Sequence, residues 1–116
     1  MSNVTIYHNP RCSKSRQTLE LIKQQGVEPD IVLYLQDTPN ASELSQLLEL
    51  LKISPRQLLR KGEADYKENN LSDPGLSDSA LIDMMIKFPK LIERPIVVAD
   101  GKAVLGRPPE NVLEIL

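Results

Sequence analysis

The residues best suited to chemistry lie close together near the start of the chain. Residues 7–16 read YHNPRCSKSR and hold the chain's only cysteine, Cys12, and its only histidine, His8. A cysteine reacts as the thiolate, which neighbouring positive charges favour over the thiol. This pattern predicts that Cys12 is a nucleophile in a site for an anion, rather than a small buried apolar side chain. The cationic neighbours are Arg11, Lys14 and Arg16.

The elements around Cys12 strengthen this prediction. Residues 4–7 form a β-prone run that ends at the breaker Asn9-Pro10, and helix formers follow over about 13–25. Cys12 should therefore stand where a strand ends and a helix begins, and there free N–H groups and the helix dipole stabilise negative charge. Such positions lower a thiol pKa from roughly 8.5 to about 3.5–7.5, and the same donors bind oxyanions.

Spacing within the loop narrows the chemistry. Cysteine phosphatases use a Cys-x5-Arg loop, whereas Arg16 follows Cys12 too closely for that pattern. Ser15 stands where dithiol oxidoreductases carry their second cysteine, so no internal disulfide can form. Redox work at Cys12 would need a resolving thiol from outside, such as glutathione or a partner protein. His8 either tunes Cys12 or is a solvent-exposed or backbone-bonded histidine.

The first half of the chain predicts a parallel strand pair followed by helices. Residues 30–35, DIVLYL, read as a second, buried strand, so residues 4–35 predict strand, helix and strand with a right-handed crossover. A helical block follows over about 38–90, opened by Thr38 as cap and by Pro39 in the first turn. Ser77 caps a later helix. Helical spacing predicts these core positions in the block: Leu44, Leu47, Leu48, Leu51, Leu81, Met84, Met85 and Phe88.

The end of the chain predicts a hairpin and a short helix. IVV and AVL flank ADGK, and an Asp-Gly centre between β-branched runs indicates a tight antiparallel hairpin. RPPENVLEIL closes the chain as a short helix started by proline, and a cis bond at Arg94-Pro95 would suit the start of a strand. The order predicts an α/β, thioredoxin/glutaredoxin-like fold in one domain, 1–116. Its small four-stranded mixed sheet carries a helical insertion between the βαβ and ββα halves.

Composition excludes several classes of protein. The chain has 116 residues, 41% hydrophobic and 26% charged, with a net charge of -2, which suits one soluble domain without nucleic-acid or membrane partners. A single cysteine forms neither an internal disulfide nor a zinc site, and no apolar run has the length of a signal peptide or membrane span. We expect a cytoplasmic monomer without a bound cofactor or metal.

Three motifs, taken together, resemble the ArsC-type arsenate reductases that use glutathione and glutaredoxin. YHNPRCSKSR resembles the family's His-Asn-Pro-x-Cys signature, and ERPIVV and GRPPENVL resemble its two later arginine-proline motifs. The resemblance covers essentially the whole chain. The arginine in LLRKGE also matches the family's arginine in the helical insertion.

The resemblance implies a role for each matching residue. Cys12 would attack arsenate and form a thiol-arsenate ester, while His8 would help to keep it ionised. Glutathione, as co-substrate, would join the adduct and reduce As(V) to As(III), and glutaredoxin would resolve the mixed disulfide to release arsenite. The oxyanion would be held by these arginines: Arg16, Arg60, Arg94 and Arg107. Arginine suits this role because it stays charged and presents a planar fork of donors.

The sequence differs from the best-known members just after the cysteine. Glycine and threonine are expected there, whereas this chain has Ser13 and Lys14. This difference indicates a divergent branch, in which the added lysine keeps positive charge near the anion while altering turnover or substrate preference.

Two other functions fit parts of the pattern. A glutathione-linked monothiol oxidoreductase acting on protein disulfides, or on another small oxyanion, would need Cys12 but not Arg60, Arg94 and Arg107. A regulator that binds RNA polymerase is the third reading, but such sensors generally use a Cys-x-x-Cys switch, which Ser15 rules out.

Overall fold

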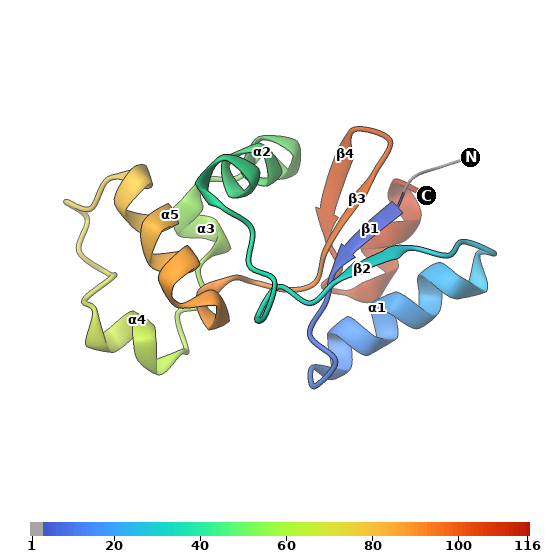
Figure 1. Cartoon of the computed structure of the whole chain (residues 1–116), viewed down its shortest axis with the longest axis horizontal. Coiled ribbons are helices and arrows are strands. Elements are labelled where there is room, and N and C mark those ends of the chain that lie inside the picture. Colours follow the sequence, from blue (N-terminus) through green and yellow to red (C-terminus); the bar gives the residue numbers. More distant parts are fainter. Residues whose placement is uncertain (1–3) are drawn as a thin grey trace. The chain divides into compact units, whose positions relative to one another are not determined.

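The computed structural model describes residues 4–116, which form two compact units (Figure 1). The first unit combines the chain up to Asp37 with Arg94–Leu116, and the second is Thr38–Glu93. The first contains β1 (Val4–Tyr7), α1 (Ser13–Gln24), β2 (Asp30–Val32), β3 (Ile96–Ala99), β4 (Lys102–Leu105) and the 3₁₀ helix η2 (Pro109–Glu114).

The sheet of the first unit has the predicted four strands, in the order β2-β1-β3-β4. β1 pairs parallel with β2 and antiparallel with β3, and β3 pairs antiparallel with β4. The tight hairpin between β3 and β4 turns at Asp100 and Gly101, whose φ angles are 50° and 76°. Both values lie in the left-handed region that such turns require and that Asp-Gly favours. The mixed sheet and its hairpin confirm the predicted fold class.

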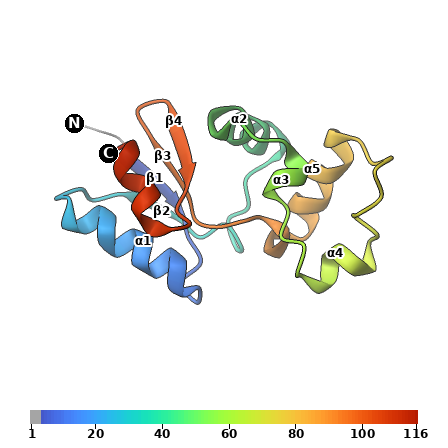
Figure 2. The same cartoon turned by 180° about the vertical axis from the view of Figure 1, so that it is seen from behind.

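One face of this sheet is covered by α1 and η2, which pack side by side (Figures 1 and 2). The core between these layers consists of apolar side chains from both, and burying them is the main stabilising term of the unit. The short C-terminal helix is a 3₁₀ helix at the place where the sequence predicts a helix started by proline. The fully buried members of this core are Val4, Ile6, Ile22, Val97, Ala99 and Val112.

The second strand differs from its prediction. The pairing ends at Val32, and the chain turns at Leu33, whose carbonyl accepts hydrogen bonds from the N–H groups of Gln36 and Asp37. Most of the run is also exposed, because β2 is an edge strand: Ile31 is 46% exposed, and only Tyr34, which lies after the strand, is buried. An apolar run alone does not distinguish a central strand from an edge strand.

The second unit is helical, as predicted for the block at 38–90. It contains α2 (Ala41–Leu51), α3 (Pro55–Leu58), α4 (Ala64–Glu68), α5 (Asp78–Lys87) and the 3₁₀ helix η1 (Pro89–Leu91). The first helix is capped by Asn40, not by the predicted Thr38, because Asn40 forms a reciprocal capping box with Glu43. Ser77 caps α5 as predicted, accepting from the Ala80 N–H at 3.1 Å.

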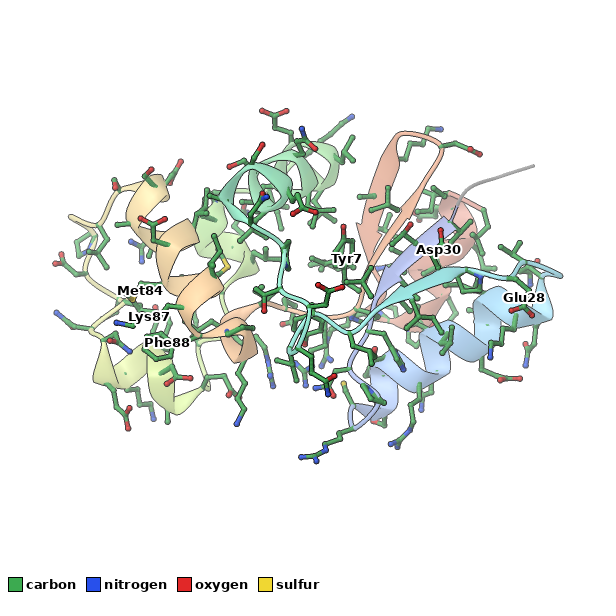
Figure 3. All side chains as sticks on the ribbon, viewed as in Figure 1. Tyr7, Glu28, Asp30, Met84, Lys87 and Phe88 are labelled. Atoms are coloured by element: carbon green, nitrogen blue, oxygen red, sulfur yellow. The ribbon has the colours of Figure 1, made fainter. Side chains whose placement is uncertain are left out.

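Most of the predicted helical core positions are buried. Leu44, Leu47, Leu48, Leu81 and Met85 are at most 5% exposed. The other three are only partly buried. One of them, Phe88, lies with its ring centroid 5.5 Å from Lys87 Nζ, close to Met84 (Figure 3). The single domain over 1–116 stays a prediction.

Candidate active site

Cys12 occupies the N-cap position of α1, directly after the loop that follows β1. Its N–H donates to the Asn9 carbonyl at 3.0 Å, and its carbonyl accepts from the Arg16 N–H at 3.0 Å. These two bonds end the loop and begin the helix, as the sequence predicts. The Cys12 side chain makes no capping hydrogen bond as a thiol, and it is partly exposed. The N–H groups of the first helical turn are therefore available to an anion.

The surroundings of Cys12 favour the thiolate. Partial burial raises the thiol pKa, but the backbone N–H of Ser15, the charge of Arg94, the N–H of Lys14 and hydrogen bonding by Arg94 lower it. The net result is a pKa below the ordinary value of a cysteine. Lys14 acts on the thiol here through its backbone, and its side chain is exposed. A thiolate near neutral pH is the form that attacks an electrophile.

His8 lies at the end of β1 and is only 5% exposed. Its Nδ1 lies 2.7 Å from Ser15 Oγ, which also accepts the Asn9 N–H at 3.0 Å. Burial, followed by the positive charges of Arg16 and Lys23, lowers the pKa of His8. This lowered pKa favours the neutral imidazole, which acts on the loop through its hydrogen bond to Ser15. The predicted role of His8 in ionising Cys12 stays a prediction.

Three of the four predicted arginines belong to the same unit as Cys12, and two of them, Arg94 and Arg107, lie on either side of the β3–β4 hairpin. Arg94 is separated from β3 by Pro95 alone, and its guanidinium interacts with the Cys12 thiol. Arg107 follows β4 and is exposed. Each is joined to the next proline by a cis peptide bond. The structure therefore brings Cys12 and Arg94 together. Arg107 directly follows Gly106, whose N–H donates to the carbonyl of Pro95, the residue after Arg94, at 2.9 Å.

The other two arginines have identified local partners. Arg16 Nη1 donates to the Pro10 carbonyl at 3.1 Å, so it braces the loop before Cys12. Arg60 lies in the second unit, where Nη1 is 3.4 Å from Glu63 Oε2 and donates to the Lys90 carbonyl at 3.3 Å. For both residues, oxyanion binding stays a prediction.

A cavity of about 260 Å³ opens beside the loop, on the side of β2. Backbone and side chains of the loop form one wall, and the turn after β2 forms the other. Its lining residues are His8, Asn9, Pro10, Arg11, Leu33, Leu35 and Gln36. Within residues 4–116, no cluster of three metal-binding side chains occurs, and no helix is long and apolar enough to cross a membrane.

Sequence reasoning missed the part played by the polar residues of α1 that face inward. Ser15 and Thr18 are fully buried, on the same side of the helix as the core residue Ile22. Their spacing, i, i+3 and i+7, is that of a helix stripe facing a core. Small polar residues inside such a stripe were the available signal, because a buried hydroxyl needs a hydrogen-bond partner.

Comparison with known proteins shows a matching family and several similar proteins. Residues 7–115 match the model of the ArsC family. The chain is 60% identical over 114 residues to a protein of Escherichia coli K12 named uncharacterized protein YfgD, covering 97% of this chain and 96% of that one. It is 50% identical over 116 residues to an arsenate reductase of the same strain, covering 100% of this chain and 82% of that one. An arsenate reductase from Vibrio cholerae has the same fold, with a TM-score of 0.96, 53% identity and 98% coverage of both chains.

Proposed function

This chain belongs to the ArsC family, and on that premise we propose that it is an arsenate reductase whose nucleophile is the Cys12 thiolate. One observation carries the proposal: the thiol stands at the start of α1 with a lowered pKa, beside the guanidinium of Arg94. The same donors that stabilise the thiolate suit the oxygens of a tetrahedral anion.

In the first step, the Cys12 sulfur attacks As(V) and forms a sulfur–arsenic bond. One arsenic–oxygen bond breaks, and its oxygen takes up protons and leaves as water. The positive charge of Arg94 partly neutralises the approach of one anion to another. The N–H groups of Lys14 and Ser15 and the Arg107 guanidinium contribute further donors toward the arsenate oxygens.

In the second step, two thiols reduce the bound arsenic. A glutathione thiol bonds to the arsenic, and a second arsenic–oxygen bond breaks, its oxygen leaving as water. A glutaredoxin thiol then attacks the glutathione sulfur, and the bond between that sulfur and arsenic breaks, leaving its electron pair on arsenic and so taking As(V) to As(III). Each thiol loses one proton and one electron, and the pair ends as a mixed disulfide. Water then bonds to As(III) and loses a proton as the sulfur–arsenic bond breaks, so that arsenite leaves and Cys12 returns to the thiolate. Ser15 supports this dependence on external thiols, because its Oγ is buried against His8 in the place of a second cysteine.

Arg60 and Arg16 are proposed to complete the anion site. Arg60 would hold arsenate and stabilise the As(III) intermediate, and Arg16 would add charge at the loop. We further propose a monomer in the cytoplasm, where the supply of reduced glutathione suits the reaction.

The test is an NADPH-coupled assay with arsenate, glutathione, glutaredoxin and glutathione reductase. The wild type should oxidise NADPH only when arsenate is present, and Cys12→Ser should abolish this activity. Arg94→Ala should reduce it strongly, whereas Lys102→Ala, which removes an exposed cation from the hairpin of the same unit, should not. NADPH oxidation by the wild type at the same rate with and without arsenate would contradict the proposal.

The alternative is a glutathione-linked monothiol oxidoreductase acting on protein disulfides or another small oxyanion. The observation that favours it is the Cys12-to-Ser15 spacing, with serine in the place of a resolving cysteine. The same assay with a glutathionylated peptide in place of arsenate separates the two. Turnover of that peptide by both wild type and Arg94→Ala, without a response to arsenate, would favour the alternative.

A further inference from the structure

We propose that Thr18 is a positioning residue whose hydroxyl fixes the segment carrying Arg107 against α1, and so sets Arg94 and Arg107 relative to Cys12. The role in arsenate binding rests on the proposed function. The anchoring itself rests on contacts of residues that touch neither the thiol nor the substrate.

Thr18 is fully buried on the inner side of α1. Its Oγ1 lies 2.8 Å from the Lys14 carbonyl oxygen and 3.1 Å from the Gly106 carbonyl oxygen, and its single hydroxyl proton is shared between these two acceptors. A helical threonine commonly bonds back to the carbonyl one turn earlier, so the helix itself accounts for the Lys14 contact. The Gly106 contact joins residues 88 positions apart in the chain, and the helix does not account for it.

Gly106 is held on both sides. Its N–H donates to the Pro95 carbonyl at 2.9 Å, and its carbonyl accepts from Thr18. No side chain fits there, because a Cβ would lie 2.7 Å from Thr18 Cγ2 and 2.9 Å from Pro95 Cγ. Gly106 therefore sits where α1 and the segments of the two arginine-proline motifs meet.

The carbonyls on either side of Gly106 are held as well. Asn111 Nδ2 donates to the Leu105 carbonyl at 3.2 Å and to the Arg107 carbonyl at 3.1 Å. Three consecutive carbonyls thus accept hydrogen bonds from two side chains, Asn111 and Thr18. This arrangement fixes the backbone from which the Arg107 side chain extends.

On the side of α1, the hydrogen bonding of Thr18 involves the first turn of the helix, which directly follows Cys12. Thr18 bonds to the Lys14 carbonyl, and the N–H groups of Lys14 and Ser15 act on the thiol. The other side is continuous with Arg94, which precedes Pro95 and also acts on the thiol. Loss of the hydrogen bond between Thr18 and Gly106 should therefore shift Arg94 and Arg107 relative to the start of α1.

The experiment compares Thr18→Val, which keeps the shape but removes the hydroxyl, with Thr18→Ser, which keeps the hydroxyl but removes a methyl group. Thr5→Val is the matched control, because Thr5 lies on β1 among the partly exposed positions of that strand. The first readout is the pH dependence of Cys12 alkylation by iodoacetamide, which needs no arsenate reduction. The second is the arsenate concentration that half-protects Cys12 from alkylation.

We expect Thr18→Val to raise the alkylation midpoint by about half a pH unit, because Arg94 interacts less well with the thiolate. The half-protecting arsenate concentration should rise about tenfold, since small misplacements of binding groups are costly. Thr18→Ser and Thr5→Val should match the wild type in both readouts. If Thr18→Val does not fold, Asn111→Ala tests the same segment, and it should raise the half-protecting concentration without moving the alkylation midpoint.

Two results with the Thr18 variants would overturn the proposal. One is a folded Thr18→Val, checked by circular dichroism, with the wild-type midpoint and protection. The other is an equal effect of Thr18→Val and Thr18→Ser, which would assign the effect to packing. Unchanged protection in Asn111→Ala would likewise contradict the anchoring. A wild type that fails to reduce arsenate would refute the proposed function alone, because the alkylation comparison would still decide the role of Thr18.

Discussion

The crowding around Gly106 allows a quantitative prediction for Gly106→Ala. The added Cβ would come within 2.7 Å of both Thr18 Oγ1 and Cγ2, closer than real Cβ contacts permit. The same Cβ would lie 2.9 Å from Pro95 Cγ. Neither neighbouring residue has room to move away, because Thr18 is fully buried and Pro95 is buried. Forcing a methyl group into such a site costs about 1–3 kcal/mol. Displacing the Thr18 hydroxyl from the Gly106 carbonyl adds about 0.5–1.5 kcal/mol.

We therefore expect Gly106→Ala to lower the free energy of unfolding by roughly 1.5–4.5 kcal/mol. Gly26→Ala is a matched control in the same unit, because its Cβ would meet no atom within 4 Å while its φ of +78° disfavours alanine. That strain alone should cost about 1–2 kcal/mol.

The assay is urea unfolding followed by far-UV circular dichroism, with amide exchange of β1 and β3 as a report on the first unit. A Gly106→Ala protein as stable as the wild type, or more stable than Gly26→Ala, would refute the steric argument.

Three further predictions concern the loop. The alkylation midpoint of Cys12 should lie below the ordinary cysteine pKa, and Arg94→Ala should raise it by about 1 unit, whereas Lys102→Ala should leave it unchanged; equal midpoints in all three proteins would contradict the thiolate assignment. Ser15→Ala should lower the free energy of unfolding by about 1–3 kcal/mol, because His8 and a buried N–H lose their partner, and urea unfolding would show no change if that network were unimportant. The pKa of His8 is lowered in the folded state, so the unfolded chain binds its proton first as pH falls; the stability that neutral His8 contributes is complete above its unfolded pKa and is lost as pH falls from there through the folded pKa. Unfolding measured between pH 7.5 and 5 should therefore show a smaller loss in His8→Gln than in the wild type, and parallel curves would contradict this prediction.

The sequence predicted the parts of the fold that depend on local signals. The breaker after β1 and the helix formers from Ser13 onward place Cys12 correctly at a helix start, because the signals lie within a few residues of it. The Asp100-Gly101 turn was predictable for the same reason, since only few residue types adopt two successive left-handed conformations.

The rest depended on contacts that short-range patterns do not contain. The exposure of Ile31 follows from the position of β2 at the sheet edge, which the pairing of the other strands decides. Asn40, and not the predicted Thr38, caps α2, because Glu43 occupies the N3 position after Asn40 that a reciprocal capping box requires. The bond between Thr18 and Gly106 joins two ends of the chain, so neither residue alone predicts it.

The start of α1, which has no side-chain cap, couples the stability of the helix to the ionisation of Cys12. α2, α3 and α5 begin with Asn40, Ser54 and Ser77, whose side-chain oxygens accept hydrogen bonds from the first turn. Such caps typically contribute about 0.5–2 kcal/mol. At α1 that position holds a cysteine, and the neutral thiol forgoes this contribution. Ionisation of Cys12 gives the N–H groups of the first turn an acceptor. The reactive thiolate form of the protein is therefore also the form in which the start of α1 is more stable.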